Sequence, residues 1–251
     1  LGGEPVIMAA VGEDFAPYAA RLDGLGLSRE CVRTVEGSYT AQAFITTDLS
    51  DNQITAFHPG AMNQSHLNDA GAANDIKLGI VSPDGREGML AHCAQFHEAG
   101  IPFVFDPGQG MPLFNGEELL QMVRQADYVT LNDYEAELLQ ARTGQSLDQL
   151  AREVDALIVT KGAEGSDFHV DGKIIRIPVA PVREVVDPTG CGDAFRAGLL
   201  HGIGQGMDWE TTGRLASLMG AIKIESRGGQ THAPSRLEIE TRFAESFGYR
   251  I

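Results

Sequence analysis

The sequence predicts an α/β fold built on a mostly parallel sheet that helices cover on both faces. From residue 75 onward, short apolar runs alternate with segments whose apolar residues are spaced as on one face of a helix, which is typical of such a sheet. The runs are apolar at successive positions, as in strands buried on both faces. Residues 31–61 differ, because strand-like segments follow one another there without helices. We therefore expect a main domain of residues 1–30 and 62–251 and a small separate sheet of residues 31–61.

The individual elements follow from apolar spacing and from the glycines, prolines and turn residues that bound them. The strands expected in the main domain cover residues 6–11, 76–81, 102–105, 128–131, 156–160, 165–170 and 173–179. The helices expected there cover residues 13–25, 86–99, 117–125, 134–142, 147–153, 194–203, 209–224 and 235–247. The small sheet is expected as a meander of strands 32–35, 39–47 and 53–57 with one exposed face, and its turn chemistry lies at 48–52.

Composition and charge limit the classes of partner. The chain has 251 residues and a net charge of −16, which argues against nucleic acid or an anionic membrane as a general partner. Its three cysteines lie far apart, as expected in a reducing compartment without disulfides or a zinc site. No signal peptide and no membrane-spanning apolar run are visible, so we expect a cytoplasmic protein. Because a buried strand is expected from Val6 onward, we also expect that a longer parent protein has residues before Leu1.

The most informative stretch is a glycine-rich turn, Gly190-Cys191-Gly192-Asp193, which leads into an apolar helix. Free backbone N–H groups of such a turn and about half an elementary charge at the helix start together favour an oxyanion such as a phosphoryl group. A carboxylate beside that position is suited to accept the proton of an attacking hydroxyl, as phosphoryl transfer to an alcohol requires. The alternative is that Asp193 is only a helix-start residue favoured by the helix dipole.

Two further polar stretches follow apolar strands, at the edge where parallel sheets bind ligands. Asn132 and Glu135 stand three residues apart at a helix start, where they form either a capping box or oxygen ligands for Mg²⁺. The second stretch, Thr160-Lys161-Gly162, ends a strand and is followed by Gly165.

The run from Asp187 to Phe195 resembles the C-terminal signature of the PfkB/ribokinase family of carbohydrate and nucleoside kinases. The Asn132-x-x-Glu135 pair and the early Val11-Gly12-Glu13-Asp14 stand in the same order as similar motifs of that family. The resemblance implies a ribokinase-like three-layer α/β/α fold with a small β-sheet lid, here residues 31–61. It also implies that Asp193 is the catalytic base and that Gly190, Cys191 and Gly192 form the anion hole.

The resemblance further implies ATP as co-substrate and Mg²⁺ as its metal. Asn132 and Glu135 then organise Mg²⁺, mostly through water. The residues implied for the nucleotide are Thr160, Lys161, Gly162 and Gly165 in one loop and Gly228 and Gly229 at the border of the adenine pocket. Asp187 and Thr189 match positions that supply cation ligands in potassium-dependent relatives, so K⁺ is an open expectation; a simple turn-capping role for Asp187 is the alternative.

The implied reaction is phosphorylation of a primary hydroxyl of a small-molecule nucleoside or sugar. Adenosine, converted to AMP, is the first choice; ribose, fructose or another sugar is the second, and a catalytically silent nucleoside- or sugar-binding member is the third. Phe44 and Phe57 of the lid are expected either to stack on a purine or to form the core of the lid itself. Closure over a site and pairing of two lids in a homodimer are compatible roles, and both stay open.

Overall fold

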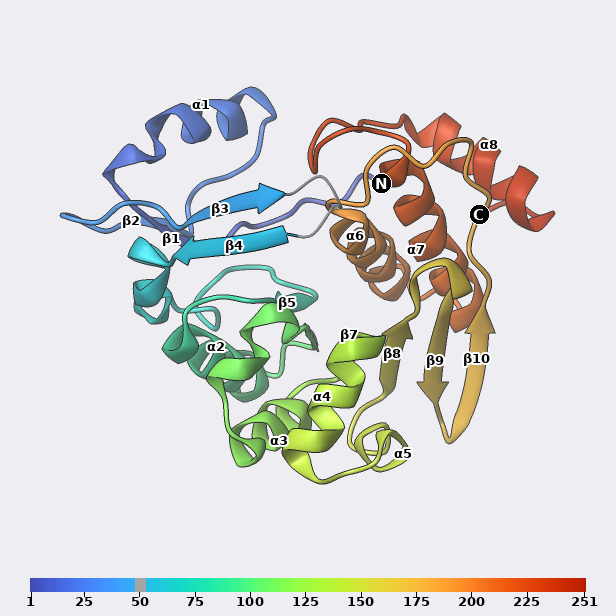
Figure 1. The fold of residues 1–251 in the computed structure, drawn as a ribbon, viewed down its shortest axis with the longest axis horizontal. Coiled ribbons are helices and arrows are strands. Elements are labelled where there is room, and N and C mark those ends of the chain that lie inside the picture. The colour runs from blue at the N-terminus through green and yellow to red at the C-terminus, as the bar shows by residue number, and fades with distance from the viewer. Residues whose placement is uncertain (48–52) are drawn as a thin grey trace. The chain divides into compact units, whose positions relative to one another are not determined.

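A computed structural model describes residues 1–47 and 53–251 (Figure 1). The turn expected at 48–52 lies outside the described residues. The chain divides into two compact units, which we call the N-terminal unit (Glu4–Ala126) and the C-terminal unit (Leu1–Gly3 with Asp127–Ile251). In the two described ranges, no helix is both long enough and apolar enough to span a bilayer.

The main sheet is mostly parallel, which confirms the expected α/β class. Its strand order is β10-β9-β8-β7-β6-β5. The strands are β5 (Gly79–Val81), β6 (Phe103–Phe105), β7 (Tyr128–Asn132), β8 (Ala156–Thr160), β9 (Ser166–Val170) and β10 (Lys173–Ile177). The pairs β5–β6 and β7–β8 are parallel, whereas β9 runs antiparallel to both β8 and β10. The antiparallel part is the hairpin expected around Asp171 and Gly172.

In the C-terminal unit, helices cover both faces of the sheet. The helices are α4 (Asp133–Thr143), α5 (Leu147–Leu150), α6 (Cys191–Gly204), α7 (Trp209–Ile224) and α8 (Arg236–Phe247), with a 3₁₀ turn, η4 (Gly162–Glu164). Ile158 of β8 packs in one buried cluster with Phe195 of α6 and Ala216 of α7. Successive side chains of a strand point to opposite faces, so the buried Leu157 and Val159 lie on the other face, where α4 contacts β7 and β8.

The two helices on the first face approach each other closely. A Cβ atom at Gly198 of α6 would lie 2.6 Å from the Cα of Ala216 in α7, so only glycine fits at this crossing. The contact fixes where α6 lies along α7, and therefore where the first turn of α6 is held.

The N-terminal unit contains short strands, 3₁₀ turns and three α-helices among its described residues. They are β1 (Ala9–Val11), η1 (Glu13–Phe15), α1 (Ala16–Gly24), β2 (Val32–Thr34), β3 (Gln42–Thr47), β4 (Gln53–His58), η2 (Gly60–Leu67), α2 (Arg86–Ala99), η3 (Gly108–Leu113) and α3 (Gly116–Gln125), together with β5 and β6. α2 packs on β5, and the rings of Phe96 and Phe103 stack with centroids 5.5 Å apart.

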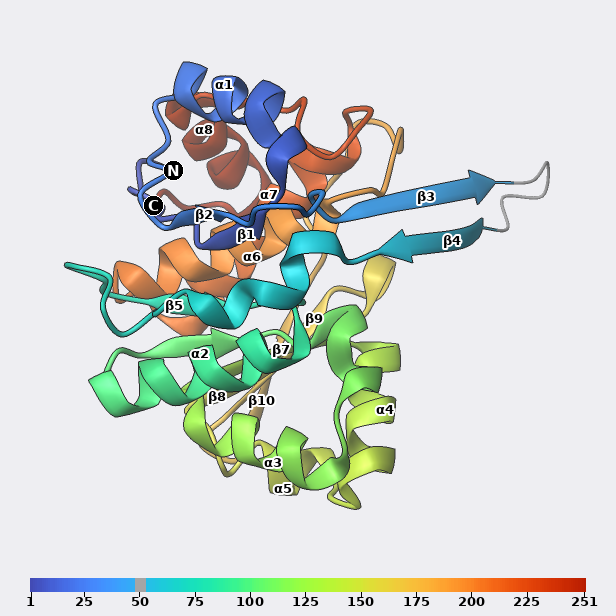
Figure 2. The same cartoon turned by 90° about the vertical axis from the view of Figure 1, so that its left-hand side faces the viewer.

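The expected three-stranded meander is wrong. β2 pairs in parallel with β1, with Val11 opposite Thr34, and α1 forms the crossover between them. Only β3 and β4 pair as an antiparallel hairpin, which extends away from the other elements of its unit (Figure 2). The strand expected at 6–11 is confined to Ala9–Val11.

The expectation of one exposed face for the small sheet is also wrong. Cross-strand partners share a face, so Phe44 lies with Ala56 and Phe57 lies with Ala43 on the opposite face. Phe44 is 60% exposed and Phe57 is 53% exposed, so both faces of the β3–β4 hairpin are open.

Candidate active site

The site is built around the start of α6, which the glycine-rich turn shapes. Gly190 is the residue before the helix and has a φ of +82°, in the left-handed region that favours glycine. A Cβ atom there would also lie 3.2 Å from the Cα of Gly229. The helix begins at Cys191, three residues earlier than the sequence predicts, because Gly190 permits the sharp entry. Asp193 therefore lies inside the first turn.

Backbone N–H groups are available at this helix start. The N–H of Ala194 makes the first intrahelical bond, to the carbonyl of Gly190 at 3.0 Å, and the N–H of Cys191 donates to the carbonyl of Pro188 at 3.1 Å. The N–H groups of Gly192 and Asp193 precede the regular helix ladder, where helices leave their donors without intrahelical partners. These two amides, with the helix dipole, are suited to bind an anion, whereas the N–H of Cys191, which the resemblance assigns to the anion hole, is already bonded to Pro188.

Asp193 is exposed beside these amides, so its carboxylate can meet a substrate. In Figure 1, β8 points upward and α6 begins above it, which places the first turn on the side of the carboxyl end of β8. Arg196 adds a positive charge here, since a Cβ atom on Gly192 would lie 2.6 Å from its Nη1. Burial raises the pKa of the Cys191 thiol, so this side chain stays protonated at neutral pH and does not act as a nucleophile.

Asp187 organises the loop that leads into α6. Its carboxylate accepts hydrogen bonds from the N–H of Gly228 at 2.7 Å and from the N–H of Thr189 at 2.9 Å. These bonds, with a further one from the Thr189 side chain, lower the pKa of Asp187 to about 2. The carboxylate therefore carries a fixed negative charge and joins the turn before α6 to the loop after α7.

Lys223 in the last turn of α7 belongs to the same group, although the sequence analysis missed it. Its side chain is fully buried, and its Nζ donates to the carbonyls of Asp187 at 2.8 Å and Ser226 at 3.0 Å. The signal in the sequence is a lone lysine in the apolar run 221–224. The structure thus gathers Asp187, Gly190, Lys223 and the Gly228–Gly229 loop around the start of α6.

Asn132 and Glu135 form a capping box at the start of α4. Asn132 Oδ1 accepts from the N–H of Glu135 at 2.7 Å, and Glu135 Oε2 accepts from the N–H of Asn132 at 2.8 Å. Glu135 is buried. Asn132 ends β7 directly opposite Thr160 at the end of β8, so two sequence-predicted residues are neighbours at one sheet edge.

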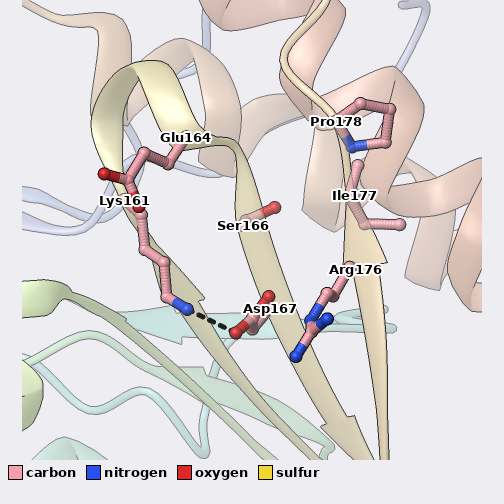
Figure 3. A pocket seen from close by; sticks show the side chains of 7 residues that line it. All are labelled: Lys161, Glu164, Ser166, Asp167, Arg176, Ile177 and Pro178. Atoms are coloured by element: carbon pink, nitrogen blue, oxygen red, sulfur yellow. Dashed lines mark hydrogen bonds and ion pairs between the residues drawn. The ribbon is translucent and has the colours of Figure 1, made fainter.

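The loop after β8 is held by its own turn. Thr160 donates its hydroxyl to the carbonyl of Leu131 at 3.3 Å, and Lys161 forms an ion pair with Asp167 (Figure 3). Gly162 and Gly165 have φ values of +54° and +89°, and a Cβ atom at Gly165 would lie 2.1 Å from the carbonyl oxygen of Ile177. These glycines are required for the tight path between β8 and β9.

This loop borders a pocket of about 390 Å³. Its lining carries charges of both signs at the ends of β8, β9 and β10: Lys161, Glu164, Ser166, Asp167, Arg176, Ile177 and Pro178. Figure 3 shows the side chains of Lys161, Asp167 and Arg176 pointing into the same opening. The pocket is open at the surface of the C-terminal unit and has room for part of a small molecule.

No direct protein cage for a metal is present in the part of the chain that the structure describes, since no group of three or more His, Cys, Asp or Glu side chains could hold an ion there. The oxygens of Asn132 and Glu135 are of the type that a Mg²⁺ ion takes as ligands, most often through water.

A family comparison identifies the class to which the chain belongs. Residues 1–236 match the model of the pfkB family of carbohydrate kinases. The chain belongs to the pfkB carbohydrate kinase family.

Relatives of known structure share this fold over almost the whole chain. The nucleoside kinase of Burkholderia thailandensis in complex with inosine is 55% identical, with a TM-score of 0.96, and the match covers 100% of this chain and 82% of that one. The same kinase in complex with ADP-inosine matches with a TM-score of 0.95 and covers 100% and 79% of the two chains. The nucleoside kinase of Methanocaldococcus jannaschii, described as a member of the ribokinase family, has a TM-score of 0.91 at 30% identity and covers 98% and 82%. The fold is therefore the expected ribokinase fold.

Proposed function

We propose that this protein is an ATP-dependent nucleoside kinase that phosphorylates a primary hydroxyl of a purine nucleoside. The observation that carries the proposal is the exposed Asp193 in the first turn of α6, beside the amides of Gly192 and Asp193. The kinases from Burkholderia thailandensis and Methanocaldococcus jannaschii support a nucleoside as the acceptor. Adenosine, giving AMP, is the first candidate from the sequence, and inosine stands beside it because the Burkholderia kinase binds it.

In the proposed reaction, the Asp193 carboxylate accepts the proton of the acceptor hydroxyl. The hydroxyl oxygen forms a bond to the γ-phosphorus of ATP, the bond to the bridging oxygen breaks, and ADP leaves with that electron pair. The amides of Gly192 and Asp193 stabilise the negative charge on the transferring group. Because such transition states are loose, positioning and charge stabilisation outweigh the strength of the base.

The nucleotide is proposed to lie along the loops of the C-terminal unit. Thr160, Lys161, Gly162 and Gly165 shape the loop after β8, beside the 390 Å³ pocket, and the Gly228–Gly229 loop lies against Gly190. Magnesium, held through water near Asn132 and Glu135, would neutralise charge on the phosphates. Because the capping box fixes both side chains, these residues would hold the ion's waters in a defined orientation.

A sugar is the second candidate acceptor. The ribokinase of Bacillus subtilis is 27% identical over 247 residues, covering 96% of this chain and 82% of that protein. A protein that only binds its nucleoside or sugar, without catalysis, is the third.

One assay separates these alternatives. ATP consumption by the full-length protein is measured with adenosine, inosine, ribose and fructose, each with and without Mg²⁺. Turnover with a purine nucleoside well above turnover with either sugar supports the proposal. Preference for ribose or fructose supports the sugar kinase. If one of the four compounds binds but ATP is consumed with none of them, a binding protein without catalytic activity is supported.

The β3–β4 hairpin is the surface proposed for a homodimer, because it exposes large apolar side chains on both faces. Ile54 is 78% exposed on the face of Phe44, and Ile45 is 58% exposed on the face of Phe57. The mass of the protein in solution, measured for the wild type and for Ile54→Glu, tests this: a dimer that the substitution dissociates is the expected result.

A further inference from the structure

Lys223 is a buried lysine that the proposed reaction does not use. Its side chain is 0% exposed, although lysine is almost never fully buried unless it is paired. An ammonium group has three donors, and two of them reach backbone carbonyls, of Asp187 at 2.8 Å and of Ser226 at 3.0 Å. A positive charge is therefore held inside the unit by backbone oxygens.

The ammonium lies where two loops meet at the start of α6. The N–H groups of Val186 and Asp187 both donate to the carbonyl of Ile224, at 2.9 and 3.0 Å, next to Lys223 in sequence. A Cβ atom on Gly190 would lie 3.6 Å from the Cε of Lys223. The side chain of Lys223 thus holds the segment from Asp187 to Gly190 in place, and Gly190 leads directly into the helix start that carries the candidate anion site.

The oxygens around this ammonium are of the type that a potassium ion uses, namely backbone carbonyls beside a carboxylate. The family resemblance matches Asp187 and Thr189 to positions of cation ligands, but Asp187 does not fit a potassium ion. Both carboxylate oxygens of Asp187 accept backbone N–H groups, and its carbonyl accepts the ammonium. A potassium ion on the same oxygens would stand within a few ångströms of another positive charge and would be repelled.

We propose that the ammonium of Lys223 takes the place of a monovalent cation, so that the protein is structured and active without K⁺. Lys223 is a positioning residue: it holds the Asp187–Gly190 segment and supplies a positive charge near the anion site. The effect on turnover rests on the proposed kinase function, whereas the effect on stability does not.

The first test uses the wild-type full-length protein in potassium, sodium and tetramethylammonium chloride at equal ionic strength. Tm and, with the acceptor, kcat and KM are measured in each salt. Equal Tm and equal kcat in the three salts are expected, because the charge is built into the chain. A rise in Tm or kcat that is specific to K⁺ overturns the inference.

The second test uses a pair of substitutions that differ in the space they leave. Lys223→Ala opens a space beside the two carbonyls, and Lys223→Met fills it with an apolar side chain. Both variants are expected to have a lower Tm, because the carbonyl oxygens of Asp187 and Ser226 lose their hydrogen-bond donor. Potassium should restore the Tm and kcat of Lys223→Ala but not those of Lys223→Met, and the larger tetramethylammonium should restore neither. Lys173→Met, at an exposed lysine that begins β10, is the matched control and should behave as the wild type.

The outcomes separate this inference from the proposed function. A Lys223→Met variant with wild-type Tm and kcat, or a Lys223→Ala variant that K⁺ does not restore, overturns the role of Lys223 and leaves the kinase assignment intact. If the protein shows no turnover with any acceptor, the kinase assignment is overturned. The Tm values in the three salts then still decide whether Lys223 takes the place of a monovalent cation. If the variants do not fold, the wild-type salt series decides it alone.

Discussion

The carboxylate of Asp187 accepts a hydrogen bond of 2.7 Å from the backbone N–H of Gly228, 41 residues further along the chain. This bond ties the turn before α6 to the loop after α7, the two segments that Lys223 also connects. The first turn of α6 is therefore fixed by contacts from a distant part of the sequence as well as by its own glycines.

The hydrogen bonds of Asp187 predict how the stability of the protein depends on pH. The pKa of Asp187 in the folded protein, about 2, is lower than its ordinary value, chiefly because of the N–H groups of Gly228 and Thr189. Its stabilising effect is complete above the unfolded pKa of about 4 and disappears as the pH falls toward 2. Asp187→Asn should lower Tm at pH 7, and the difference from the wild type should shrink between pH 4 and pH 2. A constant difference across that range contradicts the prediction; Asp148→Asn, at an exposed helix start, is the control.

Asp193→Asn tests the proposed base. We expect kcat to fall roughly 10²- to 10⁴-fold, the range for loss of a general base, because the amide cannot accept the hydroxyl proton. Tm should stay unchanged, since the side chain is exposed. The measurement is steady-state kinetics with the preferred acceptor, and Asp148→Asn should keep wild-type turnover. Near-normal turnover of Asp193→Asn would refute the assignment.

Phe44 and Phe57 of the β3–β4 hairpin give a prediction that the sequence alone could not make. Because Phe44 and Phe57 lie on opposite faces of the β3–β4 hairpin, only one of them can stack on a bound purine. One of Phe44→Ala and Phe57→Ala should raise KM for the nucleoside about 10-fold, within the range of lost base stacking, and the other should leave it unchanged. Equal increases in both variants would show that the hairpin acts as a unit instead of through one ring.

A largely buried ion pair provides a test of the stability of the C-terminal unit. Arg242 of α8 binds Glu225 through both of its terminal nitrogens, at 2.7 and 2.8 Å, and their side chains are 7% and 14% exposed. Burial alone would raise the pKa of Glu225, but hydrogen bonds from Arg242 and from the N–H of Arg183 outweigh it, and the pKa is lowered. Arg242→Met should lower the free energy of unfolding by about 3 kcal/mol, the low end for a buried pair, because it leaves the partly buried carboxylate of Glu225 with only the N–H of Arg183.

The matched control lies on the same helix. Arg236 pairs with Glu240 at 2.7 Å, with side chains 73% and 37% exposed, and Arg236→Met should cost about 0–1 kcal/mol. Urea unfolding of both variants gives the two free energies. A similar decrease in the free energy of unfolding in both variants would mean that burial does not decide how much these ion pairs stabilise the protein.

Local features could be predicted from the sequence where short-range chemistry decides them. The bounds of α7 match the expected Trp209–Ile224, because Asp208 caps its start by accepting from the N–H of Thr211. The capping box of Asn132 and Glu135 was one of the two expected alternatives, and it forms. The sequence predicts too late a start for α6, because glycine at 190 and 192 lowers helix propensity and the loop contacts that favour the earlier start are not local.

Long-range pairing explains what the sequence did not reveal. The sequence predicts β2 as part of the small sheet because the segments around it look alike, whereas in the structure β2 pairs in parallel with β1. A lysine in the last turn of a helix is ordinarily solvated and interacts favourably with the helix dipole. Lys223 is buried instead, because its ammonium group binds the carbonyl of Asp187, which lies outside the helix.

The division into two units has a consequence for how this protein can evolve. The residues proposed to handle ATP all lie in the C-terminal unit, and the aromatic side chains proposed to contact the acceptor lie on a hairpin of the N-terminal unit. Mutations that retune acceptor preference can accumulate on β3 and β4, whose side chains have few buried neighbours to disturb, while the phosphoryl-transfer machinery is inherited intact.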